Sequence, residues 1–79
     1  MMSEKLYQII ANVFNVDISK INDEITSENL EEWDSFNFYV LLDEIEKKFS
    51  ITFDLDETLE IKKIGDIKKI FAKHGVDSE

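Results

Sequence analysis

Apolar side chains recur at helical spacing in three stretches of the chain, and each stretch predicts a helix with one buried face. In the first stretch they are Leu6, Ile9, Ile10, Val13 and Phe14. They predict a helix over about residues 4–14, with Ser3 as its N-cap and Asn15 at its end.

The second helix has the clearest pattern, because one stripe along its surface is entirely apolar. That stripe consists of Phe38, Leu41, Leu42, Ile45 and Phe49. We expect this helix to begin beside Ser35. A third helix is expected to open near Gly65 and Asp66 and to stop at Gly75, which suits a left-handed C-cap. Its buried positions are Ile67, Ile70 and Phe71.

Two connections separate these helices. Residues 15–34 form a long loop with apolar anchors to the core, and Thr26 or Ser27 is placed to cap a single turn within it. Residues 51–55 alternate like a strand but find no partner strand, so we expect an extended connection and then a brief helix over about 56–61. The pattern therefore predicts an all-α bundle of three main antiparallel helices, one short helix and a long first loop.

Composition limits the possible functions. The chain has 79 residues, 18 acidic and 9 basic, with no cysteine, no arginine and one histidine. This length leaves room for one core, so residues 1–79 are expected to form a single domain. The net charge of −9 argues against nucleic acid as a partner and favours partners with basic surfaces. Because the chain has no cysteine and His74 is its one histidine, it cannot assemble a metal site from several nitrogen and sulfur ligands.

The distribution of charge and hydropathy bears on location. Most acidic residues lie within residues 21–60, so the negative field is strongest there. No apolar run reaches the roughly 18 residues of a membrane span, and the first residues do not follow the pattern of a signal peptide. We therefore expect a monomeric, cytoplasmic protein that does not bind membranes.

One face at the start of the second helix is unusual because apolar residues lie opposite the buried stripe. This face holds Phe36, Val40, Asp43 and Lys47. Acidic residues edge it, namely Asp34, Asp43 and Glu44. Either Phe36 folds back over Trp33 or the long loop, or the face is a docking surface. On a docking surface the apolar contacts would give affinity and the acidic rim would steer basic partners.

Ser35 also has two interpretations. In an arbitrary protein, a serine at this place is most often the N-cap of the following helix. Alternatively, its hydroxyl carries a covalent phosphate group, which free backbone N–H groups and the positive end of the helix dipole would stabilise. Asp34 would then hold the divalent cation that a phosphate-transferring enzyme requires.

A family resemblance favours the second interpretation. Residues 33–36, Trp-Asp-Ser-Phe, are similar to the Asp-Ser-Leu motif that opens the second helix of carrier proteins. Ile25, Leu30 and the segments 41–49 and 64–67 lie at the usual distances from that motif. The chain thus resembles the acyl carrier and peptidyl carrier superfamily over nearly all of its length, which implies an acyl-carrier-like bundle.

The resemblance implies that Ser35 receives 4′-phosphopantetheine from coenzyme A through a magnesium-dependent phosphopantetheinyl transferase, and that Asp34 helps to place the metal. The thiol of that arm would hold acyl or aminoacyl groups as thioesters, so the protein would be a carrier and not an enzyme. Enzymes that load or process these groups would bind through basic docking surfaces. Phe36, Val40 and Glu44 match positions that carriers present to such partners.

Departures from the common motif bear on the pathway. Phe36 stands where most members have leucine or methionine, Trp33 precedes the motif, and Lys47 and Lys48 occupy a stretch that is often acidic in fatty acid carriers. These departures favour a carrier for specialised lipid, aminoacyl or secondary-metabolite biosynthesis, with a housekeeping fatty acid carrier as the alternative. Aromatic residues are expected to fill the bundle, so a long acyl chain would gain little protection there.

Other interpretations stay open. The acidic stretches 22–24 and 54–57 suggest calcium loops, but neither supplies the glycine that an EF-hand loop needs. An acidic protein-interaction module without a prosthetic group fits the charge but leaves the placement of Asp34 and Ser35 unexplained. A carrier fold without the modification is a further alternative. An enzyme is disfavoured because the sequence shows no recognisable pair of nucleophile and base.

Overall fold

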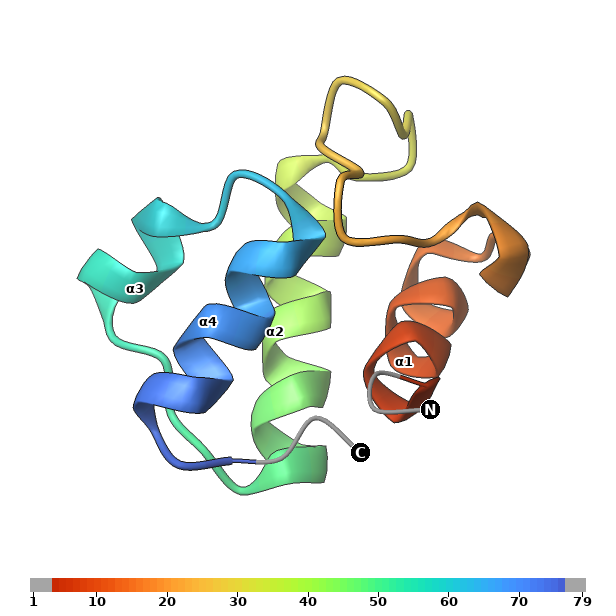
Figure 1. Ribbon diagram of the computed structural model, residues 1–79. Helices are drawn as coiled ribbons and strands as arrows, with labels where there is room; N and C mark the ends of the chain where they lie inside the picture. Colours follow the sequence, from red (N-terminus) through yellow and green to blue (C-terminus); the bar gives the residue numbers. More distant parts are fainter. Residues whose placement is uncertain (1–3, 77–79) are drawn as a thin grey trace.

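The computed structural model describes residues 4–76, which contain four α-helices, one short 3₁₀ helix and the segments that connect them (Figure 1). They are α1 (Glu4–Phe14), η1 (Ile18–Lys20), α2 (Ser35–Phe49), α3 (Leu55–Glu60) and α4 (Ile64–Lys73). The predicted all-α bundle is confirmed, with its short helix and its long first loop. The predicted cap Ser3 lies outside the described residues.

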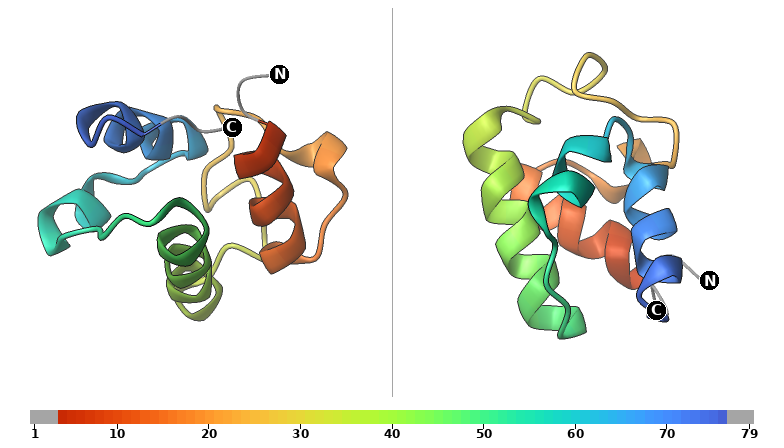
Figure 2. Two further views of the ribbon diagram at one scale, coloured as in Figure 1. Left: turned by 90° about the horizontal axis from the view of Figure 1, so that it is seen from below. Right: turned by 90° about the vertical axis from the view of Figure 1, so that its left-hand side faces the viewer.

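The three long helices surround one core. α1 runs in the opposite direction to α2 and α4, which share a direction (Figure 1). The short α3 lies beside α2 and α4, on the side away from α1 (Figure 2). As expected, an extended connection and not a strand leads from α2 to α3.

The apolar stripes read from the sequence form the core. Its fully buried side chains include Leu6, Ile10, Phe14, Leu41, Ile45, Ile64, Ile67 and Phe71. Burial of each such side chain contributes about 1.5–3 kcal/mol. Phe49 packs on Phe71 with ring centroids 4.7 Å apart, which joins the end of α2 to the end of α4.

Residues in the left-handed backbone conformation end the three long helices. Asn15 (φ 58°) follows α1, Ser50 (φ 57°) caps α2, and Gly75 (φ 71°) follows α4. Glycine reaches this conformation without a steric penalty, and asparagine tolerates it better than most residues. The ends predicted at Asn15 and Gly75 are confirmed, whereas the role of Ser50 is not evident from the sequence.

The long first loop is bonded to the start of α4. The backbone N–H groups of Ile64 and Gly65 donate to the carbonyl oxygens of Ile25 (3.0 Å) and Asp23 (2.9 Å). A helix cannot pair the N–H groups of its own first turn, so the loop satisfies them. Gly65 permits this close approach, because a Cβ at that position would lie only 3.2 Å from the Cβ of Asp23.

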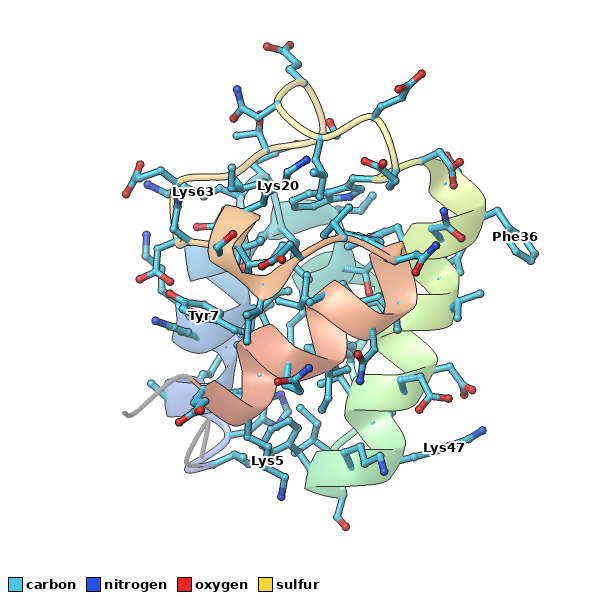
Figure 3. The ribbon with its side chains drawn as sticks, turned by 90° about the vertical axis from the view of Figure 1, so that its right-hand side faces the viewer. Lys5, Tyr7, Lys20, Phe36, Lys47 and Lys63 are labelled. Carbon is cyan, nitrogen blue, oxygen red and sulfur yellow. The ribbon has the colours of Figure 1, made fainter. Side chains whose placement is uncertain are left out.

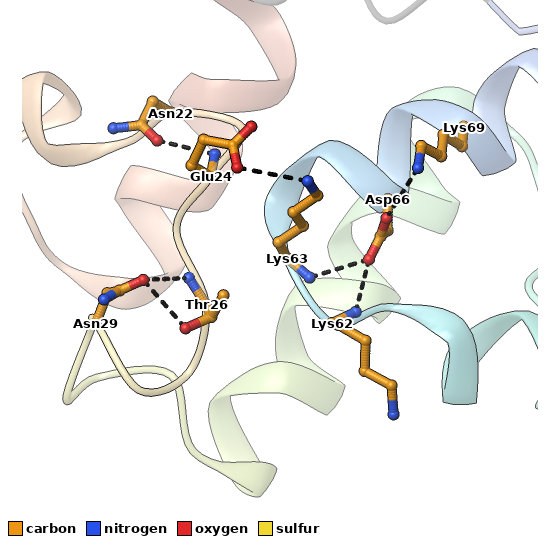
Figure 4. A network of polar contacts seen from close by, with 8 residues as sticks. All are labelled: Asn22, Glu24, Thr26, Asn29, Lys62, Lys63, Asp66 and Lys69. Carbon is orange, nitrogen blue, oxygen red and sulfur yellow. Dashed lines mark hydrogen bonds and ion pairs between the residues drawn. The ribbon is translucent and has the colours of Figure 1, made fainter.

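Side-chain contacts reinforce this junction (Figure 4). Asp66 accepts hydrogen bonds from the backbone N–H groups of Lys62 (2.9 Å) and Lys63 (3.1 Å). The ammonium group of Lys63 reaches across to Glu24 in the loop, at 3.4 Å. The loop therefore has a defined position relative to α4.

A turn inside the loop begins at Thr26. Its hydroxyl oxygen accepts from the N–H of Glu28 (3.2 Å), and its carbonyl oxygen accepts from the N–H of Asn29 (3.0 Å). The side-chain oxygen of Asn29 in turn accepts a hydrogen bond from the N–H of Thr26 (Figure 4). Of the two predicted caps, Thr26 and not Ser27 performs this role.

Candidate functional site

Asp34, and not Ser35, caps α2. The Asp34 backbone is extended (φ −108°, ψ 179°), and its Oδ1 accepts a hydrogen bond from the N–H of Asn37 at 2.8 Å. Ser35 is the first residue of the helix and is exposed to solvent. The interpretation of Ser35 as the N-cap is therefore wrong. Its hydroxyl makes no hydrogen bond to any residue within 4–76, so it is available for chemistry.

The first turn of α2 has both paired and free backbone donors. Asn37 and Phe38 direct their N–H groups at the side chain and the carbonyl oxygen of Asp34, at 2.8 and 2.9 Å. The N–H groups of Ser35 and Phe36 have no partner within the described residues, as expected in a first helical turn. These free donors and the positive end of the helix dipole favour an anionic group at Ser35. A phosphodiester on its oxygen would fit this site.

A cleft of about 400 Å³ opens next to Ser35. Its lining residues are Ser27, Trp33, Asp34, Ser35, Phe38 and Ile61. Trp33 is 8% exposed, and its ring lies 5.9 Å from that of Phe14 and 5.8 Å from that of Phe38, measured between centroids. The floor of the cleft is therefore a packed aromatic stack.

Apolar side chains are exposed beside the cleft. Phe36 is 75% exposed and points away from the bundle (Figure 3), and Val40 is 38% exposed. The alternative in which Phe36 folds over Trp33 is wrong, because Phe38 occupies that place. Tyr39, Leu55 and Leu59 are also largely exposed. Sequence reasoning missed the two leucines, although their spacing of four residues on a short helix places them on one face.

The acidic residues predicted to edge this surface differ in their partners. Asp43 forms an ion pair with Lys47 at 3.1 Å, and its hydrogen bond and charge raise the pKa of Lys47. Glu44 is half-buried and makes no ion pair within the described part of the chain. Asp34 is exposed. Lys47 thus largely balances the charge of Asp43 and also attracts Glu44, whereas Asp34 has no ion pair among the described residues.

Besides Lys47, four of the nine lysines form ion pairs with carboxylates of the described residues. The pairs are Lys63–Glu24, Lys68–Asp23, Lys69–Asp66 and Lys73–Glu57. Around the cleft, Glu28, Glu31 and Glu32 are exposed, and none of them forms an ion pair within residues 4–76. The Ser35 end therefore carries uncompensated negative charge, which favours basic partners.

Asp23 fixes the position of the long first loop, which contributes Ser27 to the cleft. Tyr7 donates a hydrogen bond to its carboxylate, and the Lys68 ammonium lies 2.8 Å from the same oxygen. Burial opposes ionisation of Asp23, but the hydrogen bonds from Lys68 and Tyr7 outweigh it and lower the pKa of Asp23 below its ordinary value. The charged form of Asp23 thus joins the loop to both α1 and α4.

Glu57 holds α3 in a comparable way. Its side chain is 2% exposed, accepts from the N–H of Asp54 (3.1 Å) and lies 2.8 Å from Nε2 of His74. The Asp54 hydrogen bond, together with those of His74 and Lys73, overcomes burial and lowers the pKa of Glu57. The contacts of Asp23 with Lys68 and of Glu57 with His74 join residues far apart in the chain, so local spacing gave no signal for them. The bond between Asp54 and Glu57 is local, and their spacing of three residues is that of a capping box.

Two further findings concern sites of other kinds. Within residues 4–76, no helix is long and apolar enough to cross a bilayer. In the same part of the chain, no group of three or more histidine, aspartate or glutamate side chains is arranged to hold a metal ion.

Comparison with known proteins identifies the family. The family model described as the phosphopantetheine attachment site matches residues 4–71, from the start of α1 into α4. The chain has no match among the curated proteins. Domains of this family carry 4′-phosphopantetheine and are not catalytic themselves. Because the match covers most of the sequence, the chain belongs to the phosphopantetheine-binding family of acyl and peptidyl carrier proteins.

Proposed function

We propose that Ser35 is the residue that carries 4′-phosphopantetheine, and that the chain is a cytoplasmic carrier for acyl or aminoacyl groups in a specialised lipid, aminoacyl or secondary-metabolite pathway. The observation that carries the proposal is the position of Ser35. Its exposed hydroxyl lies on the first turn of α2, while Asp34 provides the helix cap. When bound, the arm supplies a terminal thiol that holds the cargo as a thioester.

The attachment reaction has a simple balance. The Ser35 oxygen attacks the phosphorus of coenzyme A that bears the pantetheine, the bond to the other phosphate breaks, and 3′,5′-bisphosphoadenosine leaves. The proton of the hydroxyl passes to a base of the transferase. The second carboxylate oxygen of Asp34 is not used by the cap, so it would be free to help hold the Mg²⁺ of the transferase, which would supply charge neutralisation at the phosphate.

We expect the purified chain to gain the mass of one phosphopantetheinyl group after incubation with coenzyme A, Mg²⁺ and a broad-specificity phosphopantetheinyl transferase. Intact mass spectrometry measures this gain. Ser35→Ala should remain unmodified. Ser27→Ala is the matched control, because Ser27 lines the same cleft, and it should be modified like the wild type. An unmodified wild-type chain would favour the acidic interaction module, and a modified Ser35→Ala variant would place the arm elsewhere.

The exposed residues of α2 support a docking role. In the proposal, Phe36 and Val40 give apolar contacts to partner enzymes, and Asp34 and Glu44 attract their basic residues. Asp43 contributes less, because Lys47 balances its charge. The exposed glutamates of the loop extend the same negative surface around the arm.

The aromatic stack under the cleft supports a short or aminoacyl cargo. Trp33, Phe14 and Phe38 occupy the space next to Ser35 that a long chain would need to enter the core. Interiors packed in this way resist the insertion of further methylene groups. We infer that a long acyl chain stays outside the bundle.

Chain-length dependence of the melting temperature tests this inference. The hexanoyl and hexadecanoyl forms should melt within about 2 °C of each other, since a stabilisation of 1 kcal/mol would separate them by roughly 4–8 °C in a domain of this size. Thermal unfolding followed by circular dichroism measures the difference. A rise of more than about 5 °C in the hexadecanoyl form would instead favour a housekeeping fatty acid carrier.

A further inference from the structure

A groove runs between the outer faces of α1 and α2. It consists of two adjoining hollows of about 470 and 340 Å³. Both hollows are lined by Ile9, Asn12 and Lys48. Val13 and Val40 continue the apolar floor in the second hollow. None of these residues lines the cleft beside Ser35.

One end of this groove carries unbalanced positive charge. Lys5 and Lys48 both line it, and neither forms an ion pair within the described residues. The ammonium group of Lys5 lies over the ring of Phe49, 5.2 Å from its centroid, at the C-terminal end of α2 (Figure 3). Glu4 lines the same end but has a partner of its own. In a chain of net charge −9, most other lysines are neutralised by carboxylates.

Glu44 lies in the middle of the groove, one helical turn from Lys48 and one turn from Val40 on the same face of α2. It forms no ion pair in the part of the chain that the structure describes. The groove therefore has a basic end at Lys5 and Lys48, a carboxylate in its middle at Glu44, and an apolar end at Val13 and Val40. An occupant that matches this order is an amphipathic helix with carboxylates at one end of its apolar stripe and a cation further along it.

We propose that the α1/α2 groove docks an amphipathic helix of a partner protein whose acidic residues pair with Lys5 and Lys48. Charge complementarity selects this occupant, because the Ser35 end attracts basic surfaces and repels acidic ones. The groove and the cleft share no lining residue, but Val40 and Glu44 belong both to the groove and to the proposed docking surface of α2. A partner helix in the groove would therefore compete with an enzyme that docks through these two residues, which makes the groove a second partner-binding surface of the carrier.

Two designed peptides test this proposal on the unmodified chain, so the result does not depend on Ser35. Each is a helix of about four turns with the same leucine stripe. In the first peptide glutamates flank the leucines at the N-terminal end and lysines at the C-terminal end, and in the second all flanking residues are lysines. We expect only the first peptide to shift the backbone amide NMR signals of Ile9, Val13 and Val40.

Charge-reversal variants complete the test. The double variant Lys5→Glu and Lys48→Glu should weaken binding of the first peptide by about tenfold or more. The matched control is Lys20→Glu with Lys62→Glu, which changes the net charge equally at exposed lysines outside the groove, and it should bind almost normally. Equal loss in both double variants would overturn the proposal. So would binding through Lys5 and Lys48 that occurs only with phosphatidylglycerol vesicles or with a second copy of the chain.

Discussion

Replacement of Trp33 by alanine is expected to lower the free energy of unfolding by about 3–5 kcal/mol. Trp33 is almost completely buried, and its ring lies close to those of Phe14 in α1 and Phe38 in α2, so it connects the two helices. Its loss would leave a cavity under the cleft. Because small domains have only about 5–15 kcal/mol of total stability, a measurable fraction of the variant should be unfolded at physiological temperature. Urea denaturation followed by circular dichroism measures the change.

Two other variants show whether the loss of stability comes from the buried packing of Trp33 or from the removal of any aromatic side chain. Trp33→Phe keeps a ring in the stack and should cost much less than alanine. Phe36→Ala removes an aromatic residue three positions away that is 75% exposed, so its effect should stay within about 0.5 kcal/mol. If Trp33→Ala proved as mild as Phe36→Ala, the stack would not be a principal contact between α1 and α2.

Substitutions of Asp34 are expected to affect the stability of the fold and the rate of modification by the transferase to different extents. Asp34→Asn retains a side-chain oxygen that can cap α2, so its stability should match the wild type closely. Asp34→Ala loses the bond to the Asn37 N–H and should cost about 1 kcal/mol. Both variants lack the carboxylate that we assign to Mg²⁺, so the kcat/KM of the transferase should fall by about tenfold or more with either one.

Glu32→Gln serves as the control for this pair. Glu32 is an exposed carboxylate close in sequence, and its side chain takes no part in the cap. Its neutralisation changes the net charge by the same amount as Asp34→Asn and should leave modification nearly unchanged. Modification of Asp34→Asn at the wild-type rate would show that the carboxylate acts on the helix alone.

The sequence predicts the helices well because their signals are local. The repeated apolar positions and the ends at Asn15 and Gly75 depend on neighbours within one or two turns. The exposure of Phe36 follows from the same geometry, since it lies opposite the buried stripe of α2. The family motif at Asp34 and Ser35 is equally local.

Other features depend on contacts between distant residues, which no local pattern encodes. Tyr7, Asp23 and Lys68 meet only after three segments have packed together. The choice of Asp34 over Ser35 as the cap is different, because both residue types cap helices and the sequence contains no signal that separates them. The pairing of Asp43 with Lys47 has the spacing of four residues, and this spacing could have identified it.

The division of roles between Asp34 and Ser35 has a biological consequence. Since the serine oxygen holds nothing in place, its esterification removes no bond from the folded chain. If Ser35 carries the arm as proposed, the unmodified and the modified chain should therefore have the same helix cap and closely similar stability. Removal and replacement of such an arm would likewise require no unfolding of α2.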